Sequence, residues 1–195
     1  MKRALLACLL FAAAAVLRAE GLDKPLLLVA APELRGPYGH TALLVVPMEG
    51  QHVGFILNRA TGVTLAKLFP GHAPSARVAD PVYLGGPVSP NAIFAMVRRD
   101  PGEHSLRLFG DVHVTAHAPV VDRIIEQTPN EARYFAGFVG WQRGELAAEI
   151  EAGWWLLGEP DAAVVFSKDV GDERWGMLLK RFGKQPELPA GMRGV

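Results

Sequence analysis

The chain has 195 residues, which is enough for one domain with a sizeable core but short for two. Half of the residues are hydrophobic, 21% are charged and the formal net charge is zero, a balance typical of globular proteins. Nucleic acid is therefore not expected as a partner, because a sequence-independent binder needs a clearly basic face. The basic pairs Arg98-Arg99 and Lys180-Arg181 are interpreted as solvated ends of elements.

The first 19 residues, "MKRALLACLLFAAAAVLRA", are predicted to be an export signal peptide. Lys2 and Arg3 precede an uncharged apolar run, residues 4–17, which is shorter than the about 20 residues that a membrane-spanning helix needs. An uncleaved anchor or a wrongly assigned start codon are the alternatives. Cleavage would leave no stable membrane anchor, so we expect a periplasmic or secreted protein; a cytoplasmic one is the alternative.

Cleavage would also change the charge and the cysteine content. Residues 1–19 hold three basic residues and no acid, so 17 basic and 20 acidic residues follow them, a net charge of −3. Cys8 is the only cysteine. The mature chain would therefore form no disulfide, thiol nucleophile or zinc–thiolate site.

Residues 20–183 are predicted to form the folded domain, and its N-terminal part is rich in short strands. Apolar runs bounded by proline, glycine and polar turn residues indicate such strands. Thr64 is expected to cap a short helix. The predicted elements are strands at 25–31, 41–47 and 53–59, the last two forming a hairpin, a helix at 64–69, a loop at 71–77, strands at 81–86 and 92–99, and a hairpin at 104–117.

The C-terminal part adds helices, and its last predicted helix is expected to be capped by Asp172. Many short strands mixed with three to four helices predict a single α+β domain with a mixed or antiparallel sheet, not a doubly wound one. A loose tail is predicted for residues 184–195. The predicted elements are helices at 119–127, 144–153 and 172–183, and strands at 132–141, 154–157 and 162–166.

The turn "YLGGPV" holds the first candidate binding residues, Gly85, Gly86 and Pro87. It is not a phosphate-binding P-loop, because no Lys-Ser/Thr follows the glycines. One interpretation is structural: a glycine takes a positive φ angle there or lets another backbone come close. The other is that bare backbone lines a ligand pocket.

Three more residues are candidates for the same pocket. Asn58 ends a strand and is either a turn former or a pocket donor. Trp141, between a strand and a helix, is either a core residue or a ligand platform. Glu149 lies four residues after Glu145 on one helix face, which is either solvated or aimed at a cleft.

No catalytic residue, metal site or cofactor is predicted. The G-x-S-x-G and H-E-x-x-H patterns are both absent. His113 and His117 are four residues apart, but the alternating sequence around them indicates a strand, on which that spacing is too wide for one metal.

The segments "LLLVAAPEL", "VGFILNR", "PVYLGGPV", "GFVGWQRGELAAEIEAGWWL" and "ERWGMLLKR" resemble, in order and spacing, the AlgH/YqgE family of bacterial proteins. The resemblance implies a compact α+β domain with a small β-barrel-like sheet core wrapped by helices. Its members are often described as transcriptional regulators, and no biochemical activity defines the family. The matching positions are Asn58, Gly85, Gly86, Pro87, Gly140, Trp141, Gly144, Leu146, Glu149, Trp155 and Trp175.

The chain departs from the family pattern at "RGPYGHT" and at "GELA", and most members lack an export leader. An exported protein does not meet chromosomal DNA, which argues against direct DNA binding. We therefore expect a non-enzymatic binding or regulatory module whose partner is an unidentified small molecule or protein. The alternatives are a small enzyme with a pocket at the LGGP turn, or an envelope interaction protein.

Overall fold

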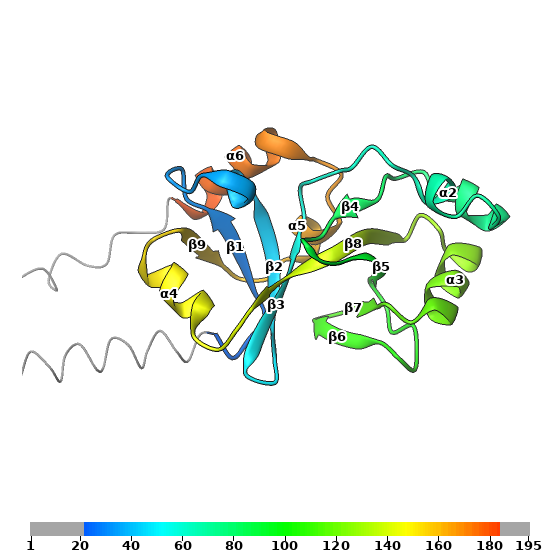
Figure 1. The fold of residues 1–195 in the computed structure, drawn as a ribbon, viewed down its shortest axis with the longest axis horizontal. Helices are drawn as coiled ribbons and strands as arrows, with labels where there is room; N and C mark the ends of the chain where they lie inside the picture. The colour runs from blue at the N-terminus through cyan, green and yellow to red at the C-terminus, as the bar shows by residue number, and fades with distance from the viewer. Residues whose placement is uncertain (1–21, 184–195) are drawn as a thin grey trace, which may run out of the picture.

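The computed structural model describes residues 22–183, so the predicted signal peptide and the predicted loose tail lie outside the described residues. The chain forms one α+β domain, as predicted. A single curled sheet, antiparallel except at β4, runs through the molecule, and helices lie around it (Figure 1).

The sheet has the strand order β6-β7-β5-β8-β3-β2-β1-β9, and β4 pairs in parallel with β8. The long strand β8 joins the two halves, because it pairs with β5 along its first part and with β3 along residues 139–141. The strands are β1 (Leu26–Ala30), β2 (Ala42–Met48), β3 (Gln51–Ile56), β4 (Tyr83–Leu84), β5 (Val88–Val97), β6 (Leu106–Phe109), β7 (Val112–Thr115), β8 (Ala132–Trp141) and β9 (Trp155–Gly158).

The helices cover the sheet at different places (Figure 1). Helix α6 packs on β1 and β9, α3 packs on β5, and α4 lies next to β9. In α3 the four buried side chains follow a helical spacing, so its apolar face meets the sheet. The helices are α2 (Leu65–Leu68), α3 (Ala118–Gln127), α4 (Glu145–Glu151), α5 (Ala162–Phe166) and α6 (Gly171–Phe182), with 3₁₀ turns η1 (Gly36–Tyr38) and η2 (Ala73–Arg77).

The core has three clusters of buried residues, and along β1 and β2 the residues of the first cluster alternate with those of the third, on opposite faces of the sheet. The first holds Phe55, Phe135 and the buried residues of α5 and α6, and the second lies under α3. The third joins Trp141, Trp155 and Leu146 of α4. Strand β1 is buried along its whole length, which explains its unbroken apolar sequence.

One predicted strand is wrong: residues 162–166 form helix α5. The Asp161 carboxylate accepts a hydrogen bond from the Ala163 N–H at 2.8 Å and so caps this helix. A five-residue apolar run fits a buried helical turn as well as a strand, because its length is too short to show a period.

Three smaller details also differ from the expectation. Residues 81–86 contribute only the two-residue strand β4, and the next strand begins at Val88 rather than at residue 92. The loop predicted at 71–77 contains the turn η2. Asp172 does not cap α6; Val170 holds that position and Asp172 lies in the first helical turn, where a negative charge is favourable.

Candidate functional site

The glycine turn after β4 passes between β3 and β8. The Gly85 N–H donates to the Ala136 carbonyl at 2.8 Å, and the Gly85 carbonyl accepts from the Ile56 N–H at 3.0 Å. A Cβ added to Gly85 would lie 2.1 Å from the carbonyl oxygen of Gly137. Neither Gly85 nor Gly86 has a positive φ angle. Both glycines lie where another backbone comes close, which is one of the two structural roles expected of them, while Pro87 is exposed.

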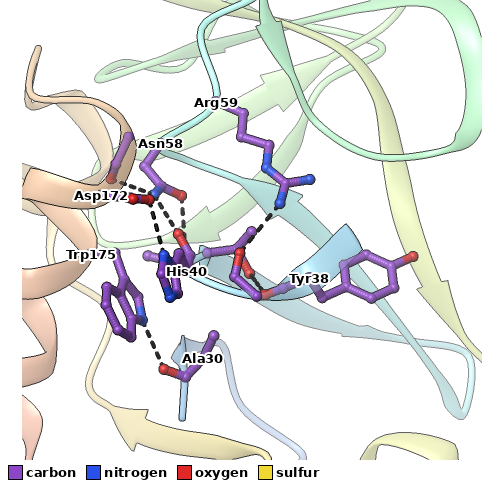
Figure 2. A network of polar contacts seen from close by, with 11 residues as sticks. Ala30, Tyr38, His40, Asn58, Arg59, Asp172 and Trp175 are labelled. Atoms are coloured by element: carbon purple, nitrogen blue, oxygen red, sulfur yellow. Dashed lines mark hydrogen bonds and ion pairs between the residues drawn. The ribbon is translucent and has the colours of Figure 1, made fainter. Parts of the chain in front are cut away.

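Asn58 is 1% exposed and joins three segments (Figure 2). Its side-chain oxygen accepts from the Ala42 N–H at 3.0 Å, and its Nδ2 donates to the carbonyls of His40 and Gly171, each at 2.9 Å. The Gly171 N–H also donates to the Asn58 carbonyl at 2.7 Å. All of these contacts hold the protein's own backbone together.

The hydrogen bonds of Asn58 form a clamp between three segments, and His40 and Asp172 lie beside this clamp (Figure 2). His40 Nδ1 is 3.1 Å from an Asp172 carboxylate oxygen, and the imidazole stacks on Trp175 with ring centroids 4.0 Å apart. The Trp175 indole donates to the Ala30 carbonyl at 2.8 Å. A histidine oriented by a carboxylate can serve in acid–base chemistry. Here the pair lines none of the cavities described below, and its contacts fasten α6 to the sheet.

Trp141 and Glu149 are brought together, as the pocket hypothesis required. One Glu149 carboxylate oxygen accepts from the Trp141 indole at 3.0 Å and from the Trp155 indole at 2.8 Å. Trp141 is 4% exposed and packs on the bare backbone of Gly54, where a Cβ would lie 2.7 Å from its ring. The carboxylate thus satisfies two buried donors.

The six predicted pocket residues therefore occupy three places: the turn beside β8, the clamp at Asn58 and the Trp141–Glu149 contact. None of the six lines any of three prominent cavities of the described residues. Their role in ligand binding stays a prediction.

The largest of these cavities is an apolar hollow of about 420 Å³. It lies between the β2–β3 hairpin, β5 and the β6–β7 hairpin. Phe55, Phe94 and Phe138 form an aromatic cluster on its wall, with ring centroids of neighbouring pairs 5.3 and 5.8 Å apart. The other lining residues are Val46, Met48, Val53, His104, Ser105, Leu106, Leu108, Val114, Thr115 and Ala116.

Sequence reasoning missed two buried arginines, Arg133 and Arg174, which are 3% and 2% exposed. Burial lowers the pKa of Arg133, partly offset by Tyr83 and Asp80. Burial, and then the charge of Arg133, lower the pKa of Arg174 to about 10. A signal was visible: Arg133 is the only charged residue in the strand "ARYFAGFVGW".

Across residues 22–183, no three histidine, cysteine, aspartate or glutamate side chains gather closely enough to hold a metal ion. His104 and His117 do meet, with stacked rings 4.1 Å apart. In the same residues, no helix is both long and apolar enough to cross a membrane.

Comparison with known proteins gives one consistent result. A family model described as AlgH-like matches residues 27–187. A UPF0301 protein of Myxococcus xanthus (strain DK1622) is 32% identical over 183 residues, covering 88% of this chain and 97% of the relative. A UPF0301 protein of Chlorobium chlorochromatii (strain CaD3) is 30% identical over 176 residues, covering 84% and 92%.

Two solved structures share the fold. The solution structure of the AlgH protein from Pseudomonas aeruginosa superimposes with a TM-score of 0.69 at 24% identity, over 89% of this chain and 96% of that one. The crystal structure of protein DIP2367 from Corynebacterium diphtheriae gives a TM-score of 0.67 at 22% identity, over 84% and 87%. At these identities the likeness concerns the fold alone.

Proposed function

Because this chain belongs to the AlgH-like family, whose matched relatives carry no activity in their names, we propose from its own cavities that it is a non-enzymatic binding module for a small, mostly apolar molecule. The observation that carries the proposal is the hollow of about 420 Å³. Ligand pockets are typically of about 300–1,000 Å³ and have apolar, aromatic walls with few polar groups. The hollow matches that description.

The polar groups in the hollow limit the chemistry of the ligand. The Thr115 hydroxyl donates to the His104 carbonyl at 2.8 Å, and the Ser105 hydroxyl donates to the Gly102 carbonyl at 2.6 Å. Both hydroxyl protons are therefore used within the protein. The His104 ring is the remaining side chain of the lining that can donate a hydrogen bond, so a polar acceptor at the end of the proposed ligand is placed beside His104.

The same contacts favour binding over catalysis in the hollow. In the described chain, Ser105 is hydrogen-bonded to Asp100 and to a carbonyl, not to a histidine that would activate it. The apolar lining also does not suit the negatively charged DNA that a DNA-binding regulator would bind. Any regulatory role would then act through the occupied or empty state of the hollow.

A neutral fluorescent probe, N-phenyl-1-naphthylamine, tests the proposal, because its emission rises when it enters an apolar site. Leu106 lines the hollow and is 44% exposed, so Leu106→Glu adds a charge at the wall without burying it deeply. We expect saturable probe binding by the wild type and affinity reduced at least about tenfold in Leu106→Glu.

Leu68→Glu is the matched control, since Leu68 is 43% exposed and lies outside the hollow. It should bind the probe as the wild type does. Thermal unfolding of each variant shows that the fold is kept. Equal probe affinity in both variants, or no saturable binding by the wild type, would contradict the proposal.

A further inference from the structure

A second cavity, of about 290 Å³, has a charged wall. It lies where the end of β5, the start of β8 and the segment after α5 meet. Its lining includes the basic side chains of Arg98, Arg99, Arg133 and Lys168, and the acidic side chains of Asp80 and Glu131. The lining therefore has more positive than negative charges.

Arg133 is the buried part of this wall. Its guanidinium donates to the carbonyls of Val165 and of Leu57, the latter at 3.0 Å, and lies 3.8 Å above the ring of Tyr83. Its Nε has no hydrogen-bond partner within the described residues. No ion pair within 4.0 Å joins it to an acidic side chain of residues 22–183.

A second buried guanidinium, that of Arg174, is not part of the cavity lining but feels the charge of Arg133. Arg174 donates to the carbonyls of Ser167 and Asp169, at 3.0 and 2.9 Å, and its Nη2 is likewise without a partner in the described chain. Two like charges close together in a medium of low dielectric repel each other strongly. Buried charges are costly unless they are paired, and neither guanidinium has an ion pair within 4.0 Å in the described chain, so a negative group in the cavity that Arg133 lines would be stabilising.

The acids of the wall do not supply that group. Asp80 is paired with Lys168 at 3.3 Å, and Glu131 with Arg99 at 3.5 Å. Each acid thus balances a cation nearer the surface, since the side chains of Lys168 and Arg99 are 78% and 46% exposed. The charge of Asp80 also acts on Arg133, but within the described residues Arg133 has no ion pair of its own.

We propose that this cavity binds a phosphate group, with Arg133 on its inner wall and Lys168 at its rim. Arginine is suited to oxyanions because its planar guanidinium presents several donors, and a lysine adds a point charge. Phe166 also lines the cavity and offers an apolar contact to the organic part of a phosphate ester. Free phosphate and a phosphate ester share this chemistry.

The test is an isotope-edited NMR titration of the chain with inorganic phosphate and, separately, with phenyl phosphate, at constant ionic strength adjusted with chloride. We expect saturable shifts at the cavity residues with a Kd of about 1 mM or below. A lower Kd for phenyl phosphate identifies an ester as the better ligand, a lower Kd for inorganic phosphate identifies the free ion, and equal values mean that the phosphate group alone is recognised.

Lys168→Met should raise the Kd about fivefold or more. Lys67→Met is the matched control, because Lys67 is exposed on α2 and lines none of the three cavities, and its Kd should equal that of the wild type. A folded Arg133→Met variant should no longer bind phosphate. If Arg133→Met does not fold, the Kd of Lys168→Met alone tests the proposal. Shifts that do not saturate, or that are unchanged in Lys168→Met, overturn the proposal.

Discussion

A Cβ atom added to Gly86 would lie 2.2 Å from the carbonyl carbon of Phe138. No real Cβ comes so near to backbone, and backbone of a central strand cannot move aside at low cost. We expect Gly86→Ala to lower the free energy of unfolding by more than about 3 kcal/mol, measured by urea denaturation.

Gly176→Ala is the opposite case and the control. Gly176 lies inside α6, and nothing lies within 4 Å of an added Cβ. Alanine is a better helix former than glycine, so this change should stabilise the protein by about 0.5–1 kcal/mol. A destabilised Gly176→Ala, or an unaffected Gly86→Ala, would contradict the packing argument.

Removal of the Asn58 side chain should be costly. In Asn58→Ala, the Ala42 N–H and the carbonyls of His40 and Gly171 lose their side-chain partners inside the protein. Unsatisfied buried groups cost about 1–3 kcal/mol each, so for three groups we expect a total loss of at least about 3 kcal/mol in chemical denaturation. Asn130→Ala removes a similar pair of contacts at an exposed site and should cost below about 1 kcal/mol.

Glu149 is expected to act on stability through the two tryptophans. Glu149→Ala removes the shared acceptor of the Trp141 and Trp155 indoles and should cost about 2 kcal/mol, with a change in tryptophan fluorescence. Glu149→Gln keeps an oxygen acceptor and should recover part of this loss. Glu151→Ala, at an exposed position of the same helix, serves as control and should change stability by less than about 0.5 kcal/mol.

Asp161 gives a prediction for acid. Burial raises the pKa of the Asp161 carboxyl. Hydrogen bonds from Arg181 and from the Ala163 N–H together lower it by more than burial raises it, so the pKa is below its usual value. A carboxyl with a lowered folded pKa contributes stability above its unfolded pKa, about 3.9, and loses it as pH falls through the folded value. Asp161→Asn should therefore be less stable than the wild type at neutral pH.

The difference between Asp161→Asn and the wild type should shrink as the pH falls below about 4. Unfolding midpoints across the acid range measure it. A difference that stays constant with pH would mean that the carboxyl contributes through packing instead of charge.

Export of the chain is tested separately, by mass spectrometry of the mature N-terminus in a periplasmic fraction. We expect a protein that has lost Met1 and the apolar run at residues 4–17. A Leu9→Arg, Leu10→Arg double variant should block export and leave the chain in the cytosol. An intact Met1 in cytosolic wild-type protein would exclude a cleaved signal.

Most of the fold could be predicted from local sequence. Buried strands such as 25–31, the hairpin at 41–59 and the helix at 119–127 each carry a period or an unbroken apolar run that one element satisfies. Helix α5 was missed because five apolar residues show no period. Strand β4 was predicted too long because the packing of Gly85 depends on residues 136–137, which the local pattern does not reveal.

The candidate site was harder to predict, for a physical reason. Polar residues such as Asn58 look alike in sequence whether they meet a ligand or the protein's own backbone, and only the partners distinguish the two. Arg98 and Arg99, interpreted as solvated ends of an element, are exposed directly after β5, and they also line a cavity with Arg133. Which charges share a wall depends on strand pairing between distant segments.

The hydrogen bonds between the N-terminal and C-terminal parts of the domain affect how the chain folds during its synthesis. Asn58 donates to a carbonyl 113 positions later, and Trp175 donates to one 145 positions earlier. Synthesis proceeds from the N-terminus, so strands β1 and β2 leave the ribosome long before α6 exists. A nascent chain that ends before Gly171 would lack partners for both segments, and we expect it to depend on chaperones until the last helix is made.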